Sequence, residues 1–117
     1  MKRIYIAGPY DGPDVITILG NIRRGIKAAS ELMKLGYAFY CPFLDYQVSF
    51  FLDEDLPKKV YQDQSLEWVK VCDAILLLPG WKKSNGVHRE IDLALKVHGH
   101  GFPIVENIKD FNSIKWT

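Results

Sequence analysis

Several features that mark particular classes of protein are scarce in this 117-residue sequence. It has only two cysteines, Cys41 and Cys72, and they lack the CxxC spacing of redox and metal motifs. The formal net charge is +1 and no run of Lys or Arg is longer than two residues, which argues against a nucleic-acid polymer as a partner. No apolar run approaches membrane-spanning length, and no targeting segment is recognisable. We therefore expect a cytoplasmic protein that does not bind membranes and keeps both thiols free and buried.

Motifs for common cofactors are also missing. The glycines of AGPYDGPD, residues 7–14, do not form GxGxxG, so a dinucleotide-binding fingerprint is absent. His88 and Asp92 have helical spacing, but no third matched ligand accompanies them. We therefore expect neither a metal nor an organic cofactor.

What the sequence does contain is strand-like segments that alternate with helical patterns. Short runs of β-branched and aromatic residues predict strands at Arg3–Ala7, Tyr37–Cys41, Asp73–Leu78 and Phe102–Val105. Apolar residues at helical spacing predict helices at Asn21–Leu35, Leu56–Val71 and Val87–His98. This alternation predicts an α/β fold, a single doubly wound Rossmann- or flavodoxin-like domain over residues 1–117 with a mostly parallel sheet of four to five strands and flanking helices.

Two segments carry further structural expectations. The buried stripe of the first helix should consist of Ile22, Ile26, Ala29 and Met33. After the second strand, Pro42 opens an expected loop of about a dozen residues that is rich in aromatic side chains. Loops of that length usually bind or cover something.

The stretch from Leu76 to Leu95 organises the candidate site. An apolar run meets a turn of Pro, Gly, Ser and Asn, and the helix after it carries Glu90 in its first turns. Open α/β sheets bind their ligands beyond the carboxyl ends of strands, where Glu90 should lie. Gly86 lets the backbone approach a ligand closely, and the N–H groups of the helix start favour an anion nearby. A carboxylate in this place should stay ionised, as a nucleophile must.

This stretch, and the chain as a whole, resembles the nucleoside 2-deoxyribosyltransferase superfamily, which includes nucleoside 5′-monophosphate N-glycosidases. Members carry a glycine four residues before the catalytic glutamate, and Gly86 and Glu90 have that spacing. The residue six before the glutamate tends to be Asp in members that act on free nucleosides and Ser in members that hold a 5′-phosphate; here it is Ser84. The resemblance implies that Glu90 is the nucleophile and that Ser84, Asn85 and Gly86 bind substrate. Ser84 also fits a plain helix N-cap, and the two roles are compatible.

The loop after the first strand is the second candidate site, because in this topology it lies beside the loop after the third strand. The resembling family has an aromatic residue in the first strand followed by a turn of small residues, and Tyr5, Gly8 and Pro9 fit that pattern. The resemblance implies that the Tyr5 hydroxyl orients the Glu90 carboxylate and that Gly8 and Pro9 contact substrate. The alternative is that Tyr5 is an ordinary aromatic strand residue.

One position departs from the family pattern. Many members carry an Asp that assists the leaving base, eight residues before the acid that opens the third strand. Counting back eight from Asp73 gives Ser65. Asp63 lies two residues upstream and is the candidate substitute, although helix neighbours two apart do not share a face. Asp73 itself is expected to be structural.

The expected function is cleavage or transfer at the N-glycosidic bond of a (deoxy)nucleoside 5′-monophosphate, with Glu90, Tyr5 and Asp63 as catalytic residues. One alternative is a non-catalytic nucleotide-binding or sensing module of the same fold. A second is a deoxyribosyltransferase that acts on free nucleosides. In each case the expected partner is a small nucleotide or nucleoside, and the acceptor, water or a second base, stays open.

A final expectation concerns assembly. In the resembling family a neighbouring subunit completes the active site. The aromatic segment after Pro42 also gives this chain more apolar surface than we expect it to bury alone. We expect a homodimer or a dimer of dimers, with contacts through Leu56–Val71 and Tyr46–Phe51. The alternative is that Tyr46–Phe51 folds over its own sheet as a lid.

Overall fold

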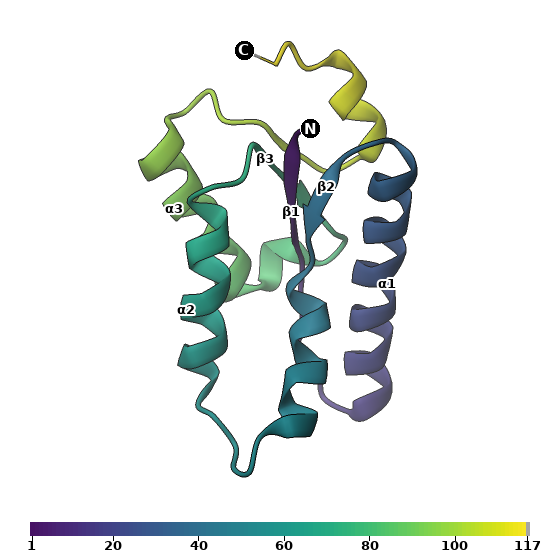
Figure 1. Ribbon diagram of the computed structural model, residues 1–117, viewed down its shortest axis with the longest axis vertical. Helices are drawn as coiled ribbons and strands as arrows, with labels where there is room; N and C mark the ends of the chain where they lie inside the picture. Colours follow the sequence, from purple (N-terminus) through teal and green to yellow (C-terminus); the bar gives the residue numbers. More distant parts are fainter. Residues whose placement is uncertain (117) are drawn as a thin grey trace.

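A four-stranded sheet lies between one helix on one face and two helices on the other (Figure 1). The structure is a computed structural model that describes residues 1–116, except for the side chains of Tyr46 and Ser49. Its strands are β1 (Arg3–Ala7), β2 (Ala38–Tyr40), β3 (Ala74–Leu77) and β4 (Ile104–Val105). Its α-helices are α1 (Val15–Lys34), α2 (Lys58–Val69) and α3 (Asn85–His98). The 3₁₀ helices of the described chain are η1 (Pro42–Phe51), η2 (Trp81–Lys83) and η3 (Ile108–Ser113).

The strands are parallel throughout, in the order β2-β1-β3-β4. This arrangement confirms the predicted α/β class, with four strands in the described chain. Because β2 lies on one side of β1 and β3 on the other, the chain changes winding direction between β1 and β3. Open α/β sheets bind ligands beyond the carboxyl ends of the strands at such a switch point.

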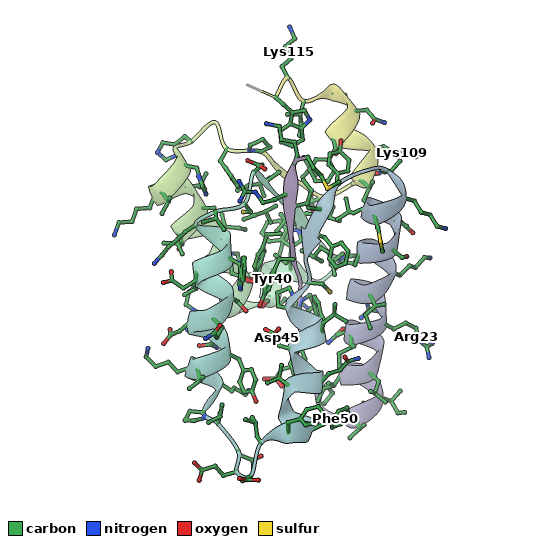
Figure 2. The ribbon with its side chains drawn as sticks, in the orientation of Figure 1. Arg23, Tyr40, Asp45, Phe50, Lys109 and Lys115 are labelled. Carbon is green, nitrogen blue, oxygen red and sulfur yellow. The ribbon has the colours of Figure 1, made fainter. Side chains whose placement is uncertain are left out.

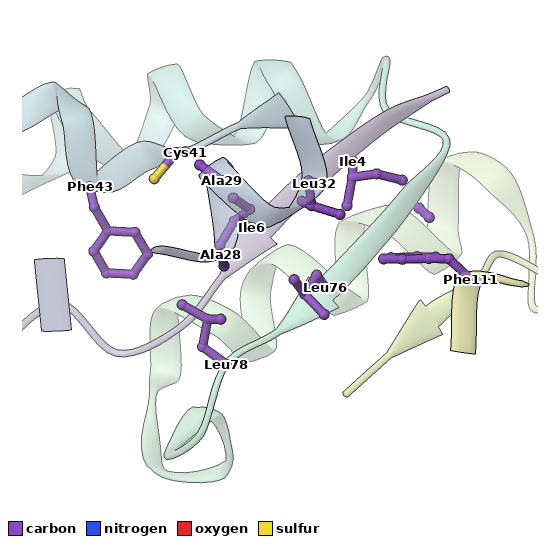
Figure 3. Close-up of a cluster of buried hydrophobic side chains, with 11 residues drawn as sticks. Ile4, Ile6, Ala28, Ala29, Leu32, Cys41, Phe43, Leu76, Leu78 and Phe111 are labelled. Carbon is purple, nitrogen blue, oxygen red and sulfur yellow. The ribbon is translucent and has the colours of Figure 1, made fainter. Parts of the chain in front are cut away.

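Alternate residues of each strand face opposite layers. Ile4 and Ile6 of β1 belong to a buried cluster with Leu32 of α1 (Figure 3). Tyr5 and Ala7 lie in a second cluster, with side chains from α2 and α3. Both faces are covered, and the strands therefore read in the sequence as continuous apolar runs.

Helix α1 begins earlier than predicted, at Val15 instead of Asn21. Its N-cap is Asp14, whose carboxylate accepts a hydrogen bond from the Thr17 N–H at 2.7 Å. Bonding to Thr17 lowers the pKa of Asp14 because it stabilises the ionised form. Ile16, in the first turn, is 78% exposed. This end of the helix has no buried apolar stripe, and the prediction, which relied on such a stripe, therefore started the helix too late.

The buried face of α1 is also rotated from the predicted one. Ile26 and Met33, both expected inside, are 42% and 61% exposed. The buried residues are Asn21, Gly25, Ala28, Ala29 and Leu32. This face is small and partly polar because α1 lies close to η1, where a Cβ on Gly25 would come within 2.4 Å of the Phe43 ring. Hydrophobic periodicity therefore placed two of the four predicted residues correctly, the buried Ala29 and the partly buried Ile22, and placed the other two wrongly.

The segment from Pro42 is a 3₁₀ helix, η1, and not the predicted loop. Pro42 suits a helix start because its fixed φ is helical, while the buried Phe43 holds the segment against α1. The far end of η1 is exposed, with Phe50 at 71% and Phe51 at 90%. The roles expected for Tyr46–Phe51, as a subunit contact or a lid, stay predictions, and the side chain of Tyr46 lies outside the described residues.

Helix η3 covers one end of the α1 face beyond β4. Its Phe111 is 1% exposed, and the Phe111 ring centroid lies 5.5 Å from that of Tyr37. Asn107 caps η3 by accepting a hydrogen bond from the Lys109 N–H at 3.0 Å. Among the helices described, none is both long and apolar enough to cross a membrane.

Candidate active site

A pocket of about 870 Å³ opens beyond the carboxyl ends of β1 and β3. Its walls come from the loop after β1, the start of η1, one side of α2 and the start of α3. The volume falls in the range of small-ligand sites, about 300–1,000 Å³. The predicted residues that line this pocket are Gly8, Pro9, Ser84, Asn85, Gly86 and Glu90. The fold therefore brings the two predicted loops into one site.

The Glu90 carboxylate is held by Tyr5 at the pocket wall. The hydroxyl of Tyr5, whose side chain is wholly buried, donates a hydrogen bond to Glu90 Oε2. Burial raises the pKa of Glu90 to about 7, and the Tyr5 hydrogen bond and the charge of Arg89 oppose that rise. This value corrects the expectation that the helix start keeps Glu90 fully ionised. Glu90 lies beyond the first turn of α3, where the helix dipole has faded and desolvation dominates.

A second tyrosine stands beside Tyr5 on the neighbouring strand. Tyr40 is the register partner of Tyr5, and their stacked rings have centroids 5.6 Å apart. The Tyr40 hydroxyl donates to Asp45 Oδ2 at 3.0 Å, and Asp45 lines the pocket (Figure 2). Two carboxyl groups, Glu90 and Asp45, are thus each held by a tyrosine at the same pocket.

The tyrosine hydroxyls and Asp45 are all shifted toward their protonated forms. Burial, followed by the negative charge of Glu90, raises the pKa of Tyr5 well above its ordinary value. Burial also raises the pKa of Tyr40 and of Asp45. A side-chain hydrogen bond with Ser65 of α2 acts in the opposite direction on the pKa of both tyrosines. Ser65, which occupies the expected position of the family aspartate, therefore lies near both tyrosine hydroxyls and lines the pocket.

The loop after β1 is fixed from behind by Asn21. The Asn21 Nδ2 donates to the carbonyl oxygens of Tyr10 at 3.0 Å and Asp11 at 3.2 Å. Its Oδ1 accepts from Arg24 Nη2 at 2.5 Å, so this 4% exposed amide is well satisfied. At the start of the loop, Gly8 lies against β3, and a Cβ there would approach the Cβ of Leu78 to 2.8 Å. The loop after β1 is therefore fixed at its start by contact with β3 and further along by Asn21.

The start of α3 forms the polar wall of the pocket. Ser84 caps α3 as predicted, because its Oγ accepts from the Val87 N–H at 3.3 Å. A Cβ on Gly86 would meet only Ser84 Oγ, at 3.8 Å, so the backbone here is open to a ligand. Lys83 and Arg89 also line the pocket and add positive charge beside the helix start. These features together favour an anionic group.

Asp63 is not part of this wall, which corrects the expectation that it belongs to the site. Its carboxylate pairs with Lys59 one turn earlier in α2, at 2.7 Å, and its side chain is 57% exposed. Ser65 lies on the pocket side of the same helix. Residues two apart on a helix point in different directions, and that geometry separates Asp63 from the site. Asp73, expected to be structural, accepts a hydrogen bond from the Arg3 N–H at 2.8 Å, at the opposite end of the sheet.

Three residues that shape the site were not anticipated: Tyr40, Asp45 and Asn21. Tyr40 stacks on Tyr5 and bonds the pocket residue Asp45 only because β2 lies next to β1, and strand order cannot be read from local patterns. The role of Asn21 had a sequence signal, which is an amide next to an apolar position of a predicted helix. A buried amide needs hydrogen-bond partners, and here they are the loop carbonyl groups.

The fold and the site define a doubly wound α/β domain with a carboxylate-bearing pocket at its switch point. The chain belongs to the family described as a domain of unknown function, DUF4406, whose model matches residues 2–102. The match covers strands β1, β2 and β3 and every predicted site residue, and it ends before β4. No curated protein matches the sequence.

Proposed function

We propose that the protein cleaves or transfers at the N-glycosidic bond of a (deoxy)nucleoside 5′-monophosphate, with Glu90 as the nucleophile. The observation that supports this most directly is the hydrogen bond from Tyr5 to Glu90 at the pocket wall. A nucleophilic carboxylate must face the substrate, keep one orientation and ionise near the working pH. Glu90 lines the pocket, is oriented by Tyr5 and has a pKa raised to about 7.

In this reaction Glu90 attacks the anomeric carbon of the sugar as the base departs. The product is a glycosyl ester of Glu90, and water or a second base then releases the sugar, as in the retaining glycosidases. The Tyr5 hydroxyl stays protonated because its pKa is raised, so it remains a donor to the carboxylate throughout. Its role is to position Glu90 and to stabilise its ionised form.

The start of α3 supports a 5′-monophosphate as the substrate in preference to a nucleoside. Ser84 uses its oxygen as the acceptor of the cap, so its hydroxyl proton is available to donate to phosphate. The first N–H groups of a helix have no partner within it and favour a bound anion. Lys83 and Arg89, which line the same pocket, add attraction for a dianion.

The proposal is tested by incubation with ribo- and deoxyribonucleoside 5′-monophosphates and the matching nucleosides, with free base measured by chromatography. We expect base release, and faster release from monophosphates. Glu90→Gln should reduce release by at least about 10³-fold while nucleotide affinity changes by less than about tenfold, because the phosphate contacts remain. Asp63→Asn is the matched control, since it neutralises an exposed carboxylate outside the pocket lining.

The possible outcomes separate the alternatives. Nucleotide binding without base release would indicate a non-catalytic nucleotide-binding or sensing module. Equal or faster release from nucleosides would indicate a deoxyribosyltransferase that acts on free nucleosides. Addition of a second base distinguishes transfer from hydrolysis, because only transfer forms a new nucleotide.

We also propose that the chain forms a homodimer or a dimer of dimers. Apolar side chains remain exposed on the segments expected to make the contact, including Trp68 of α2 at 48% and Phe51 of η1 at 90%. Exposed apolar side chains on these segments favour a partner surface, and closed symmetric assemblies dominate among oligomers. Light scattering at micromolar concentration is the test, and a mass near 13.4 kDa would contradict the proposal.

A further inference from the structure

The pocket contains a second carboxyl group that the proposed nucleophilic step does not use. Asp45 lies in the first turns of η1 and lines the pocket together with Glu90. The Tyr40 hydroxyl donates to Asp45 Oδ2 at 3.0 Å, whereas its 3.4 Å contact with Oδ1 is too long for a strong hydrogen bond. Oδ1 is therefore the oxygen that can carry a proton toward a ligand.

The surroundings of Asp45 favour its protonated form. None of the ion pairs between described side chains involves Asp45. Two of the cations that line the pocket act on other carboxylates, since Lys58 pairs with Asp11 and the charge of Arg89 acts on Glu90. Burial raises the pKa of Asp45, and the hydrogen bond from Tyr40 offsets only part of that rise. A carboxyl group held in this way keeps its proton at a higher pH than an exposed one.

Two paired tyrosines hold Asp45 and Glu90 in the same pocket. Tyr5 and Tyr40 are register partners on adjacent parallel strands, whose backbones lie about 4.8 Å apart. Their rings stack at 5.6 Å with an interplanar angle of 23°, so the two hydroxyl groups extend from the same face of the sheet. One hydroxyl meets Glu90 and the other meets Asp45. A single molecule in the pocket can therefore contact both carboxyl groups.

We propose that Asp45 is the general acid that protonates the departing base. This inference rests on the proposed function and assigns the proton-handling step that Ser65 leaves open. A serine hydroxyl does not supply protons at neutral pH, and Asp63 lies outside the pocket lining. Retaining glycosidases also use two carboxyl groups, one that attacks and one that protonates the leaving group.

The reaction proceeds in two steps, attack by Glu90 and hydrolysis of the glycosyl ester. Glu90 forms a bond to the anomeric carbon, the bond from that carbon to the base nitrogen breaks, and its electron pair leaves with the base. The proton of Asp45 passes to a nitrogen of the base, and Asp45 becomes a carboxylate. Water then attacks the anomeric carbon, Asp45 takes the proton of that water, and Glu90 departs as a carboxylate. The net reaction converts nucleotide and water into free base and sugar 5-phosphate.

The test compares two leaving groups in Asp45→Asn. One substrate is a nucleoside 5′-monophosphate that the wild type cleaves. The other carries 4-nitrophenolate on the same sugar 5-phosphate, and this group leaves without a proton. We expect Asp45→Asn to slow base release by about 10²–10³-fold but nitrophenolate release by less than about tenfold. Asp63→Asn, the matched control, should change neither rate, and Asp45→Glu should restore part of the base release.

Each other outcome is decisive. Equal losses on both substrates, or no loss on either, would overturn the role of Asp45 while the function itself stands. Loss on both substrates in Glu90→Gln is expected in every case, because the nucleophile is needed for both. If the wild type cleaves neither substrate, the proposed function fails and the role of Asp45 fails with it. Circular dichroism of each variant identifies any loss that comes from unfolding.

Discussion

The two faces of the sheet are built from alternate residues of the same strands, yet they hold different chemistry. On the α1 face, Ile4 and Ile6 pack with Leu32 in a cluster without charged groups. On the other face, Tyr5 lies between those two isoleucines in the sequence and directs a hydroxyl to Glu90. One residue along β1 thus separates a side chain that only packs from one that belongs to the candidate site.

Burial has different consequences on the two faces. On the α1 face it removes apolar surface from water and stabilises the fold. On the α2 and α3 face it also desolvates Glu90 and Asp45, which raises the pKa of both. Within the described chain, no buried side-chain nitrogen or oxygen atom lacks a hydrogen-bond partner. Burial on the second face therefore also sets the chemistry of the pocket.

The largest expected effect is on the α1 face. Leu32→Ala should destabilise the protein by about 3 kcal/mol, because it removes a fully buried side chain and leaves a cavity. Urea unfolding measures this loss, and Ile26→Ala, on an exposed part of the same helix, should cost less than about 1 kcal/mol. Base release per folded molecule should be unchanged in both. Slower release by folded Leu32→Ala would mean that the two faces are not separate in function.

The second effect is a pH dependence of stability that belongs to the pocket face. The pKa of Glu90 is about 7 in the folded protein against an ordinary value of 4.5, so the folded state holds its proton longer than the unfolded state. Stability from this group is fully present below pH 4.5 and is lost as pH rises through 7. The loss is at most about 3 kcal/mol.

Glu90→Gln isolates this contribution, because the variant keeps the other titrating groups. Its stability relative to the wild type should rise between about pH 4.5 and pH 8, as measured by urea unfolding at a series of pH values. A constant difference over that range would show that Glu90 is not desolvated in the folded protein.

The third effect is on the pH dependence of base release. Tyr5→Phe removes a hydrogen bond that stabilises ionised Glu90, so the pKa of Glu90 should rise further above 7. The acid limb of the rate profile should move to higher pH, and the rate at pH 7 should fall by about tenfold. Tyr37→Phe removes a hydroxyl from the α1 face and is the control, expected to leave the profile in place. An unshifted limb in Tyr5→Phe would refute the positioning role of Tyr5.

The smallest effect is expected at the start of α3. Ser84→Ala should raise KM for the monophosphate by about tenfold and leave KM for the nucleoside unchanged, because only the phosphate contact is lost. It should also cost about 1 kcal/mol of stability through loss of the N-cap. Asn107→Ala removes the cap of η3, away from the pocket, and should affect stability alone. Equal changes in KM for both substrates would argue against a phosphate at Ser84.

Much of the fold and half of the site could be predicted, because the signals for them are local. The strands at Arg3–Ala7 and Ala74–Leu77 are short apolar runs that end at turn residues, and both were located within a residue or two. The turn at Ser84 and the place of Glu90 after it follow from the same kind of signal. The face of α1 was predicted only in part, because its contact with Phe43 selected Gly25, a residue that hydrophobicity does not mark.

Local patterns in the sequence were enough to predict that strands alternate with helices, that the strands form a parallel sheet, and that Glu90 follows the third strand. Long-range packing, in contrast, sets β2 beside β1, which places Tyr40 next to Tyr5 and brings Asp45 to the pocket. It also decided how far Glu90 is desolvated, and hence that its pKa lies near 7. The difference lies in how far apart the interacting residues are in the chain. Periodicity and turn chemistry act between neighbours in the sequence, whereas strand order and desolvation depend on residues that are far apart in it.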